Sequence, residues 1–510
     1  MTTTRRLIAA LASVALLATA CGGGGDEAST EDASGVAAPA DDATIVIAIG
    51  SEPTTLDPQS TDDGGERAVN DNVYETLVAR DPDGELVPGL AAEMPTQVDD
   101  TTWEVVLREG VTFHNGEAFG ADAVVASVTR ILDPELNSEQ LSFFSTITGA
   151  EAVDATTVHV MTDGPDPVLP SRLYWMKMVP AEASQEDGFA ESPVGTGPYR
   201  FVEWVKGDHI TLEANADHWD GAPDIPEVTY RFLPESSTRL SALKAGEVDL
   251  MTNLLPENID QAPQAATVRG LEHPMMILHT EDGPTADVRV RRAINLAVDR
   301  EAIVDELFEG HAVADACQLL SPSWTGFNED LEPYPYDPDQ AKELLAEAGA
   351  EGATIQLVGT SGRWLKDRET VEIVGAYLSE VGLVPDIQVY EFTEYLNRLF
   401  DRETRPDAIY VSSSNELLDA DRTLTGEYHQ EGIEASYADA EMAGLIEQAR
   451  VETDPGAREE LYAQITQTAC DEAYFLFLFN MEDIYGLSER LQWEPRVDAK
   501  LLVDEMSLAG

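Results

Sequence analysis

The stretch Val194–Leu212, VGTGPYRFVEWVKGDHITL, distinguishes between two kinds of fold. Its Gly195-Thr-Gly197 could belong to a phosphate-binding loop, which needs the N-terminus of a helix directly behind it. Aromatic residues follow Pro198 instead and favour a strand, and Lys206-Gly-Asp208 is typical of a turn. The period-two alternation of Ile210-Thr-Leu-Glu213 predicts a returning strand. The stretch therefore predicts a β-hairpin, which excludes a nucleotide-binding loop at this place.

The amino terminus has the features of a lipoprotein signal. Arg5 and Arg6 precede an apolar run that is too short to span a bilayer and ends in Leu-Ala-Thr-Ala-Cys21. This ending resembles the bacterial lipobox, in which the cysteine is lipidated; a chance cysteine after an ordinary cleaved signal is the alternative. We expect a signal peptide over residues 1–20 and a flexible polar tether over residues 21–43, anchored through Cys21. The protein would lie at the outer face of the cytoplasmic membrane or in the periplasm, and the export route, Sec or Tat, stays open.

The composition is that of a globular but unusually acidic protein. Its 510 residues exceed what one hydrophobic core usually organises, so we expect more than one domain. With 31 Lys+Arg against 96 Asp+Glu, the formal net charge is −65. Such a surface repels nucleic acid. The simplest explanation of the excess of acidic residues is a hydrated, negatively charged surface suited to a salty or acidic habitat.

The sequence contains no local motif for catalysis or metal binding. CxxC, HExxH, GxSxG and GxxxxGK are absent, and the eight histidines are scattered. We therefore predict no enzymatic activity, no cofactor and no metal site; a secreted hydrolase whose residues converge only in the fold is the alternative. Cys317 and Cys470 remain after the lipidation site, and in an exported protein such a pair often forms a disulfide. The sequence does not show whether the two lie close together.

Predicted strands and helices alternate along the chain, as in an α/β fold. The signals are strongest around Asp337-Pro-Asp-Gln340, which combines an N-cap with a first-turn proline, while Gly349 would end that helix. The predicted strands are 44–49, 102–108, 151–153, 157–161, 228–232, 248–251, 353–359 and 387–390. The predicted helices are 124–132, 236–245, one beginning after Asp287, 300–309, 337–349 and 369–381.

Six stretches in a fixed order resemble one family. They are TLDP at 55–58, WEVVLREGVTFHNG at 103–116, GTGPY at 195–199, GEVD at 246–249, VRVRRAINLAVD at 288–299 and DPDQAKELLAEAG at 337–349. Together they look like the family 5 extracellular solute-binding proteins, the peptide/nickel-type receptors of ABC importers. The resemblance runs from about residue 44 to the carboxyl end.

The resemblance implies an α/β, bilobal fold of the periplasmic-binding-protein type II kind with an extra inserted subdomain. A main lobe would combine residues 44–72, 185–275 and 483–510, with the inserted subdomain at 73–184 and a second lobe at 276–482. Two crossings between the lobes would form a hinge, and the ligand would lie in the cleft. On this interpretation the GTGPY glycines are turn residues that let the hairpin pack in the main lobe.

The resemblance also implies the function and the partners. We expect a monomeric receptor that binds a small solute, in the first place short peptides, and delivers it to ABC permease subunits in the membrane. Other cargoes left open are nickel or another metal chelate, an oligosaccharide and an opine-like conjugate. A signalling co-receptor that feeds no importer is a further alternative.

The expected ligand site follows from the same resemblance. Peptide-binding members carry a W-x-A-D-Y stretch whose aspartate binds the peptide ammonium, and Ser413–Leu417 matches it here. Glu416 keeps the carboxylate, whereas Asn415 and Ser413 replace the alanine and the tryptophan, which alters the apolar wall. Glu416 could instead be one more surface acid.

Further ligand-binding residues are expected on loops near the cleft. Arg363 and Trp364 stand where relatives carry a Gly-Arg-Tyr stretch, so that Trp364 either stacks on the ligand or covers the following helix. The remaining candidates are Asn72, Trp175 and Asn253. His279 stands where the family commonly has Asn, and we expect no metal there.

Overall fold

A computed structural model describes residues 43–401, 405–432, 435 and 437–509 of the chain. The predicted signal peptide, the lipidation residue Cys21 and the tether, apart from residue 43, lie outside these ranges. Among the described helices, none has the length and the apolar character needed to cross a membrane.

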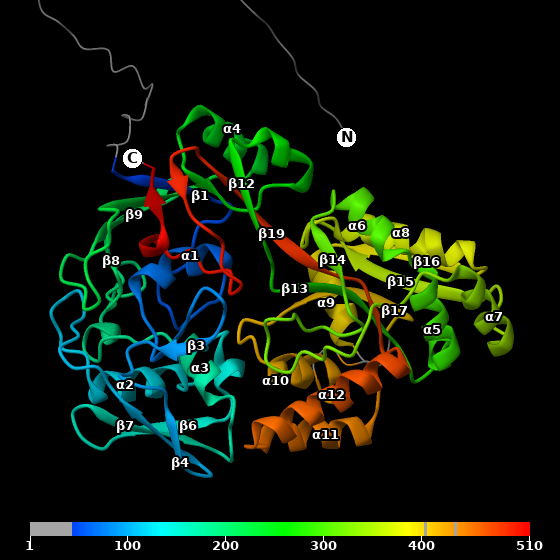
Figure 1. Cartoon of the computed structure of the whole chain (residues 1–510), viewed down its shortest axis with the longest axis horizontal. Helices are drawn as coiled ribbons and strands as arrows, with labels where there is room; N and C mark the ends of the chain where they lie inside the picture. Colours follow the sequence, from blue (N-terminus) through cyan, green and yellow to red (C-terminus); the bar gives the residue numbers. More distant parts are fainter. Residues whose placement is uncertain (1–42, 402–404, 433–434, 436, 510) are drawn as a thin grey trace, which may run out of the picture. The chain divides into compact units, whose positions relative to one another are not determined.

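The first large sheet has eight strands, and we call the part built on it the main lobe (Figure 1). Its strands are β1 (Ile45–Ile49), β8 (Tyr199–Val205), β9 (His209–Ala214), β10 (Glu227–Phe232), β11 (Leu250–Met251), β12 (Gln264–Arg269), β14 (Ala312–Ala314) and β19 (Phe479–Leu487). Strand β1 is parallel to β10 and β11 at the centre of the sheet, and its side chains are almost all buried. Helices α1 (Gly64–Val73) and α4 (Ser236–Ala245) and the short pair β20 (Leu491–Gln492) and β21 (Ser507–Leu508) complete this lobe.

Strands β8 and β9 form the predicted hairpin, which is thereby confirmed. They pair antiparallel from Tyr199 opposite Ala214, and Gly207 makes the turn at φ +78°. The preceding glycines lie against the end of α1: a Cβ added to Gly195 would be 1.9 Å from the carbonyl oxygen of Val73, and one on Gly197 would be as close as 2.6 Å to that of Asn72. No larger residue fits there, so these glycines serve close packing.

The inserted subdomain has its own antiparallel sheet and its own core. Its elements are β2 (Val78–Arg80) paired with β3 (Leu86–Pro88), the four-stranded sheet of β4 (Thr96–Asp99), β5 (Thr102–Val106), β7 (Thr157–Thr162) and β6 (Ile147–Ala152), and helices α2 (Ala121–Ile131) and α3 (Leu169–Trp175). Helix α2 buries Val124, Val128 and Ile131 at helical spacing. Leu417, from a distant part of the chain, joins this core.

The second large sheet has five strands, and we call the part built on it the second lobe. In spatial order they are β16 (Val384–Tyr390), β15 (Thr354–Thr360), β17 (Ala408–Ser414), β13 (Glu272–Leu278) and β18 (Phe475–Phe477). Alternate residues of β13 belong to different clusters: Met275 and Ile277 pack on one face, Met276 and Leu278 on the other. Both faces of this sheet are therefore buried.

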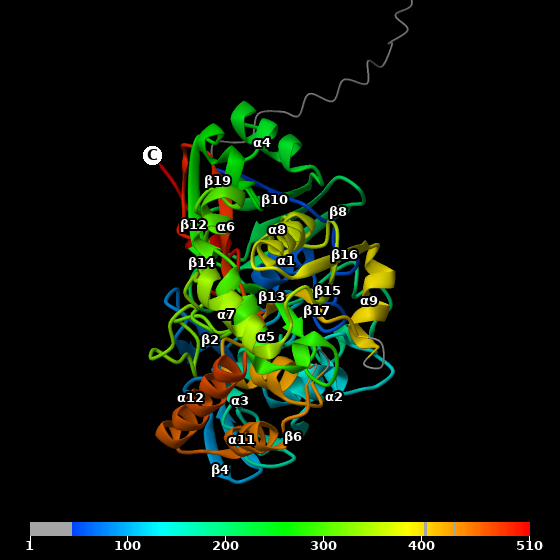
Figure 2. The same ribbon diagram turned by 90° about the vertical axis from the view of Figure 1, so that its right-hand side faces the viewer.

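Helices cover the two faces of the second sheet. They are α5 (Val288–Ala297), α6 (Arg300–Leu307), α7 (Pro338–Ala348), α8 (Asp367–Glu380), α9 (Phe392–Phe400), α10 (Ala420–Thr423), α11 (Ala440–Val451) and α12 (Pro455–Glu472). Figure 2 shows α8 on one side of the sheet and α11 and α12 on the other. The predicted caps are confirmed, because the side chains of Asp287 and Asp337 accept N–H bonds at the starts of α5 and α7, and Gly349 ends α7 at φ +67°.

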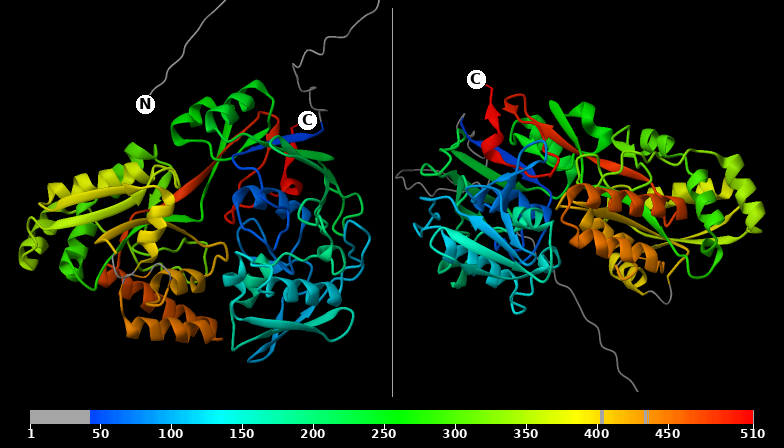
Figure 3. Two further views of the ribbon diagram at one scale, coloured as in Figure 1. Left: turned by 180° about the vertical axis from the view of Figure 1, so that it is seen from behind. Right: turned by 60° about the horizontal axis from the view of Figure 1, so that its bottom comes forward.

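At two places a strand of one large sheet leads directly into a strand of the other. Strand β13 follows β12 directly, and β19 follows β18, so the crossings lie near residues 270–271 and 478; Figure 3 shows β19 in red-orange. The Asn480 amide ties the two crossings together, because Nδ2 donates to the carbonyl oxygens of Gly270 (2.9 Å) and Glu272 (3.0 Å). The side cavity lies beside these crossings, since Glu272 and Met481–Ile484 line it.

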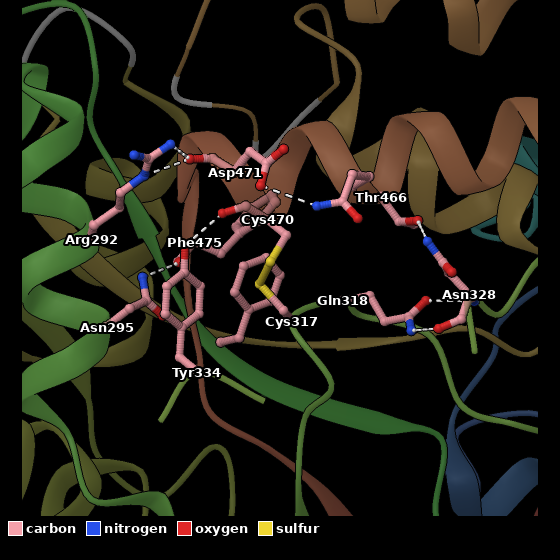
Figure 4. Close-up of a disulfide and its surroundings, with 12 residues drawn as sticks. Arg292, Asn295, Cys317, Gln318, Asn328, Tyr334, Thr466, Cys470, Asp471 and Phe475 are labelled. Atoms are coloured by element: carbon pink, nitrogen blue, oxygen red, sulfur yellow. Dashed lines mark hydrogen bonds between the residues drawn. A yellow bond between two sulfur atoms is a disulfide. The ribbon is translucent and has the colours of Figure 1, made fainter. Parts of the chain in front are cut away.

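A disulfide lies within the second lobe (Figure 4). Cys317 is bonded to Cys470, with their Cα atoms 5.4 Å apart and a sequence separation of 153 residues. The Tyr334 hydroxyl donates to the carbonyl oxygen of Cys470 at 2.6 Å. The bridge thus ties the loop after β14 to the end of α12.

Candidate ligand-binding site

Three cavities lie where the second lobe meets the rest of the chain. The polar pocket, about 510 Å³, lies between the inserted subdomain (Phe143, Arg172) and second-lobe residues that include Ser412–Ser414 and Glu427. The central cavity, about 600 Å³, and the side cavity, about 450 Å³, share Arg239, Asn253, Arg363 and Asp483.

Glu416 follows β17 and lies where the two lobes meet. Its side chain is only 4% exposed. It accepts a hydrogen bond from Ser414 Oγ at 2.8 Å, and Arg67 of α1 and Arg422 hold its two oxygens at 3.3 and 3.0 Å. Burial opposes ionisation of Glu416, but the charges of Arg422 and Arg67 outweigh this and lower its pKa to about 2. The carboxylate is therefore charged and already neutralised by the chain itself.

Arg67 is itself fixed by a second acid. It donates to Asp62 through Nε at 2.7 Å and through Nη2 at 2.9 Å, a bidentate arrangement. Burial alone would lower the pKa of Arg67, but Glu416 and Asp62 raise it. The guanidinium thus stays charged and bridges the main lobe to Glu416.

A second ion pair joins the inserted subdomain to the second lobe. Arg172 of α3 donates to Asp421 at 3.0 Å and to Asp166 at 2.9 Å, and all three side chains are almost fully buried. Arg450 lies 3.3 Å from the other oxygen of Asp421. Arg422 also spans this interface, since its guanidinium carbon lies 4.1 Å from the centre of the Phe143 ring.

The structure brings Arg363, Trp364 and Asn253 to the cavities. Arg363 and Asn253 line both the central and the side cavity, and Trp364 lines the side cavity. The Trp364 ring also packs edge-on against Tyr395 and Tyr410, at 6.0 and 5.9 Å between ring centres. The side chain therefore forms part of a cavity wall and also packs on the core, while stacking on a ligand stays a prediction.

Asp367 holds the loop that carries Arg363 and Trp364, and the sequence analysis missed it. Its buried carboxylate accepts the backbone N–H groups of Gly362, Arg363 and Trp364 at 3.1, 2.9 and 3.1 Å. An acid in the first turn of a predicted helix is the sequence signal that could have revealed this role.

Asn72 and Asn415 require a correction, because the structure uses both amides internally. Asn72 is fully buried; its Nδ2 donates to Ala68, Tyr230 and Leu501, and its Oδ1 accepts from Val503. Asn415 is also fully buried and holds its own turn through Asp419, Thr423 and Leu417. These contacts make both residues structural, in place of the predicted ligand role.

Trp175 lies in the core of the inserted subdomain and is 2% exposed. Arg67 and Lys177 each lie 5.1 Å from its ring centre. Its indole N–H has no hydrogen-bond partner among the described residues. Burial this deep supports packing and orientation of the cations more than direct contact with a ligand.

Two half-buried acids line the side cavity near the crossings. Burial raises the pKa of Asp483 to about 7, and the nearby Glu272 adds to this shift. Burial also raises the pKa of Glu272, which accepts from Ser412 Oγ at 3.1 Å. In the described ranges, no group of three or more His, Cys, Asp or Glu side chains is placed to hold a metal ion.

The arginines are the main feature that sequence reasoning missed. Arg67, Arg172, Arg422 and Arg450 converge on the region around Glu416, although the whole chain has only 31 Lys+Arg in 510 residues. They come from separate segments, so no local motif announces them. The resulting site is a set of cavities lined by guanidinium, carboxylate and hydroxyl groups, and it is suited to binding a charged solute.

Comparison with known proteins places this geometry in one family. Residues 85–434, more than half of the chain, match the family described as "Bacterial extracellular solute-binding proteins, family 5 Middle". The glutathione-binding protein GsiB of Pectobacterium atrosepticum is 27% identical over 469 residues, covering 88% of this chain and 90% of that one.

Solved structures share the fold over almost their whole length. HbpA2 from Haemophilus parasuis superposes with a TM-score of 0.82 at 25% identity, covering 91% of this chain and 100% of that one. The periplasmic binding protein DppA from Helicobacter pylori, in complex with peptide STSA, gives 0.73 at 25% identity, with 91% and 98% covered. The chain therefore belongs to the family 5 extracellular solute-binding proteins, the non-catalytic substrate-binding components of ABC importers.

Proposed function

We propose that the mature protein is held by lipidated Cys21 at the outer face of the cytoplasmic membrane and captures a short, peptide-like solute between its lobes. It then delivers the solute to the permease of its importer. The observation that carries this proposal is the mixed charge of the cavities between the lobes: Arg363, Arg239 and Asp483 line the side cavity, and Arg422, Arg450 and Glu427 line the polar pocket.

Peptides suit such a lining because they carry an ammonium, a carboxylate and amide groups. Peptide charges can form charge-assisted hydrogen bonds with such a lining, whereas an uncharged oligosaccharide offers only its hydroxyl groups. A relative of this chain is named for glutathione, a modified tripeptide, and a structural neighbour was solved with peptide STSA. Both names support a peptide-like cargo.

The mechanism is a shift of population between open and closed arrangements. The crossings β12–β13 and β18–β19 would act as the hinge, and ligand contacts to both lobes would favour the closed arrangement that the permease recognises. Micromolar affinity corresponds to about −8 kcal/mol, and part of the gross contact energy is used in closing.

A melting-temperature screen of the exported, mature protein in detergent tests the cargo class. The library would hold di- to pentapeptides, glutathione, nickel and iron chelates, opine-like conjugates and oligosaccharides. A ligand at ~100 times its dissociation constant adds about 2.7 kcal/mol to the free energy of unfolding, which shifts the melting temperature visibly. Stabilisation by peptides or glutathione is expected, and stabilisation confined to chelates or sugars would contradict the proposal.

The anchor is tested separately by mass spectrometry. The mature amino terminus is expected at Cys21 with attached acyl chains, and Cys21→Ser should release the protein from the membrane fraction. A protein that stays in the membrane fraction after this substitution would contradict the lipid anchor.

A further inference from the structure

We infer that the polar pocket selects ligands that carry an intact α-amino-acid head group, an ammonium and a carboxylate on one carbon. Glu427 receives the ammonium and Arg422 the carboxylate. This inference rests on the proposed function and names the chemical feature of the cargo that the pocket reads.

Glu427 is the acid that the chain leaves unpaired in this pocket. It lies on the π-helical turn η5 (Leu424–Tyr428) and is 9% exposed. Its Oε1 accepts from Ser413 Oγ at 2.8 Å, whereas its Oε2 is buried and has no hydrogen-bond partner among the described residues. A buried carboxylate oxygen without a donor is costly, so a ligand donor at this place gains a charge-assisted bond without displacing a protein group.

Arg422 supplies hydrogen-bond donors that could bind the ligand carboxylate. Its Nη2 is used by Glu416 at 3.0 Å, but its buried Nε finds no hydrogen-bond partner among the described residues. A guanidinium has five N–H donors in a planar fork that matches a carboxylate. Arg172 and Arg450 line the same pocket, but both already pair with Asp421, so the spare donors of Arg422 are the ones offered to a ligand carboxylate.

Arg422 and Glu427 lie on two consecutive helical segments. Arg422 is on α10, which ends at Thr423, and Glu427 is on η5, in which the N–H of His429 donates to the carbonyl oxygen of Leu424 at 2.8 Å. Arg422 and Glu427 are five residues apart and line the same pocket. An α-linked peptide separates its ammonium from its terminal carboxylate, whereas an α-amino-acid head group presents both together.

Ser413 and its neighbours make the room for such a head group. The three consecutive serines Ser412–Ser414 line the pocket with short hydroxyl side chains. The Thr425 hydroxyl is another polar group of this wall without a partner among the described residues. Hydroxyl groups can donate or accept, so they suit a group that carries both charges.

Two isomeric dipeptides test the inference directly. γ-L-glutamylglycine keeps the head group, whereas α-L-glutamylglycine has the same atoms and the same charges without it. Isothermal titration calorimetry with the exported, mature protein should give at least ~10-fold tighter binding of the γ isomer, the size of one charge-assisted hydrogen bond. Equal affinity for the two isomers, or binding of neither, would overturn the inference.

Two variants then test whether Glu427 binds the ammonium and Arg422 the carboxylate. Glu427→Gln and Arg422→Lys should each weaken binding of the γ isomer by about 10-fold or more and reduce the preference over the α isomer. The matched control Glu431→Gln, an exposed acid four residues further on, should change the affinity less than ~2-fold. A folded Glu427→Gln protein with wild-type affinity and preference would overturn the role of Glu427.

Binding of peptides without preference between isomers would refute this inference while leaving the proposed function intact.

Discussion

Glu416 and Glu427 lie eleven residues apart on the segment that follows β17, and both are buried, yet their surroundings differ. Arg67 from the main lobe and Arg422 lie 3.3 and 3.0 Å from the two oxygens of Glu416, whereas Glu427 forms no ion pair among the described residues. The first acid therefore joins the lobes, and the second remains available to a ligand. The two acids have the same residue type and similar burial. They differ because Arg67 and Arg422 are placed beside Glu416 and not beside Glu427.

The largest effect is expected from a substitution of Arg172. Its ion pair with Asp421 is an example of a buried acid that the chain neutralises itself. Arg172→Met would leave Asp421 and Asp166 in the interior without this cation. Loss of one partner of a buried pair costs about 3–5 kcal/mol, so the free energy of unfolding in urea should fall by that order. The control Arg398→Met removes an exposed arginine that pairs with Glu394 and should cause no measurable change. Wild-type stability in Arg172→Met would contradict the importance of this bridge.

An intermediate effect is expected when the two glutamates are exchanged for glutamine in turn. Glu416→Gln leaves Arg67 and Arg422 without their shared carboxylate, and the free energy of unfolding should fall by about 1–3 kcal/mol. Glu427→Gln removes a charge whose Oε2 finds no hydrogen-bond partner among the described residues, so stability should stay within about 0.5 kcal/mol or rise. Urea unfolding of both variants measures the difference. An equal loss of unfolding free energy in the two variants would contradict the distinction between Glu416, which joins the lobes, and Glu427, which is available to a ligand.

The local parts of the fold were predictable because their signals lie within a few residues of each other. Helix α4 has the predicted bounds, Ser236–Ala245, and α7 begins and ends at the predicted Asp337 and Gly349. Helix α12 carries the same signal, an Asp454 N-cap before Pro455, which the sequence analysis did not use. Strand β13, EHPMMIL, was harder, since a run buried on both faces lacks the alternation that marks a half-buried strand.

The cavities between the lobes could be linked to particular residues only where a resemblance pointed to them. Glu416, Arg363 and Trp364 were located in this way, and the structure places each at or beside a cavity between the lobes. The partner of Glu416 was not predictable, because Arg67 lies 349 residues earlier in the chain. Asn72 was misjudged for the same reason: its bonds to Tyr230 and Leu501 form only after distant segments pack together.

The smallest effect is the pH dependence that should separate wild type from Glu416→Gln. The folded state lowers the pKa of Glu416 from 4.5 to about 2, so its charged form stabilises the fold. This stabilisation is present above pH 4.5 and is lost as the pH falls toward 2, because the unfolded chain binds the proton first. The difference in free energy of unfolding between the two proteins should therefore shrink by about 1 kcal/mol between pH 5 and pH 3.5. A difference that stays constant over this range would mean that Arg67 and Arg422 do not hold Glu416 in its charged form.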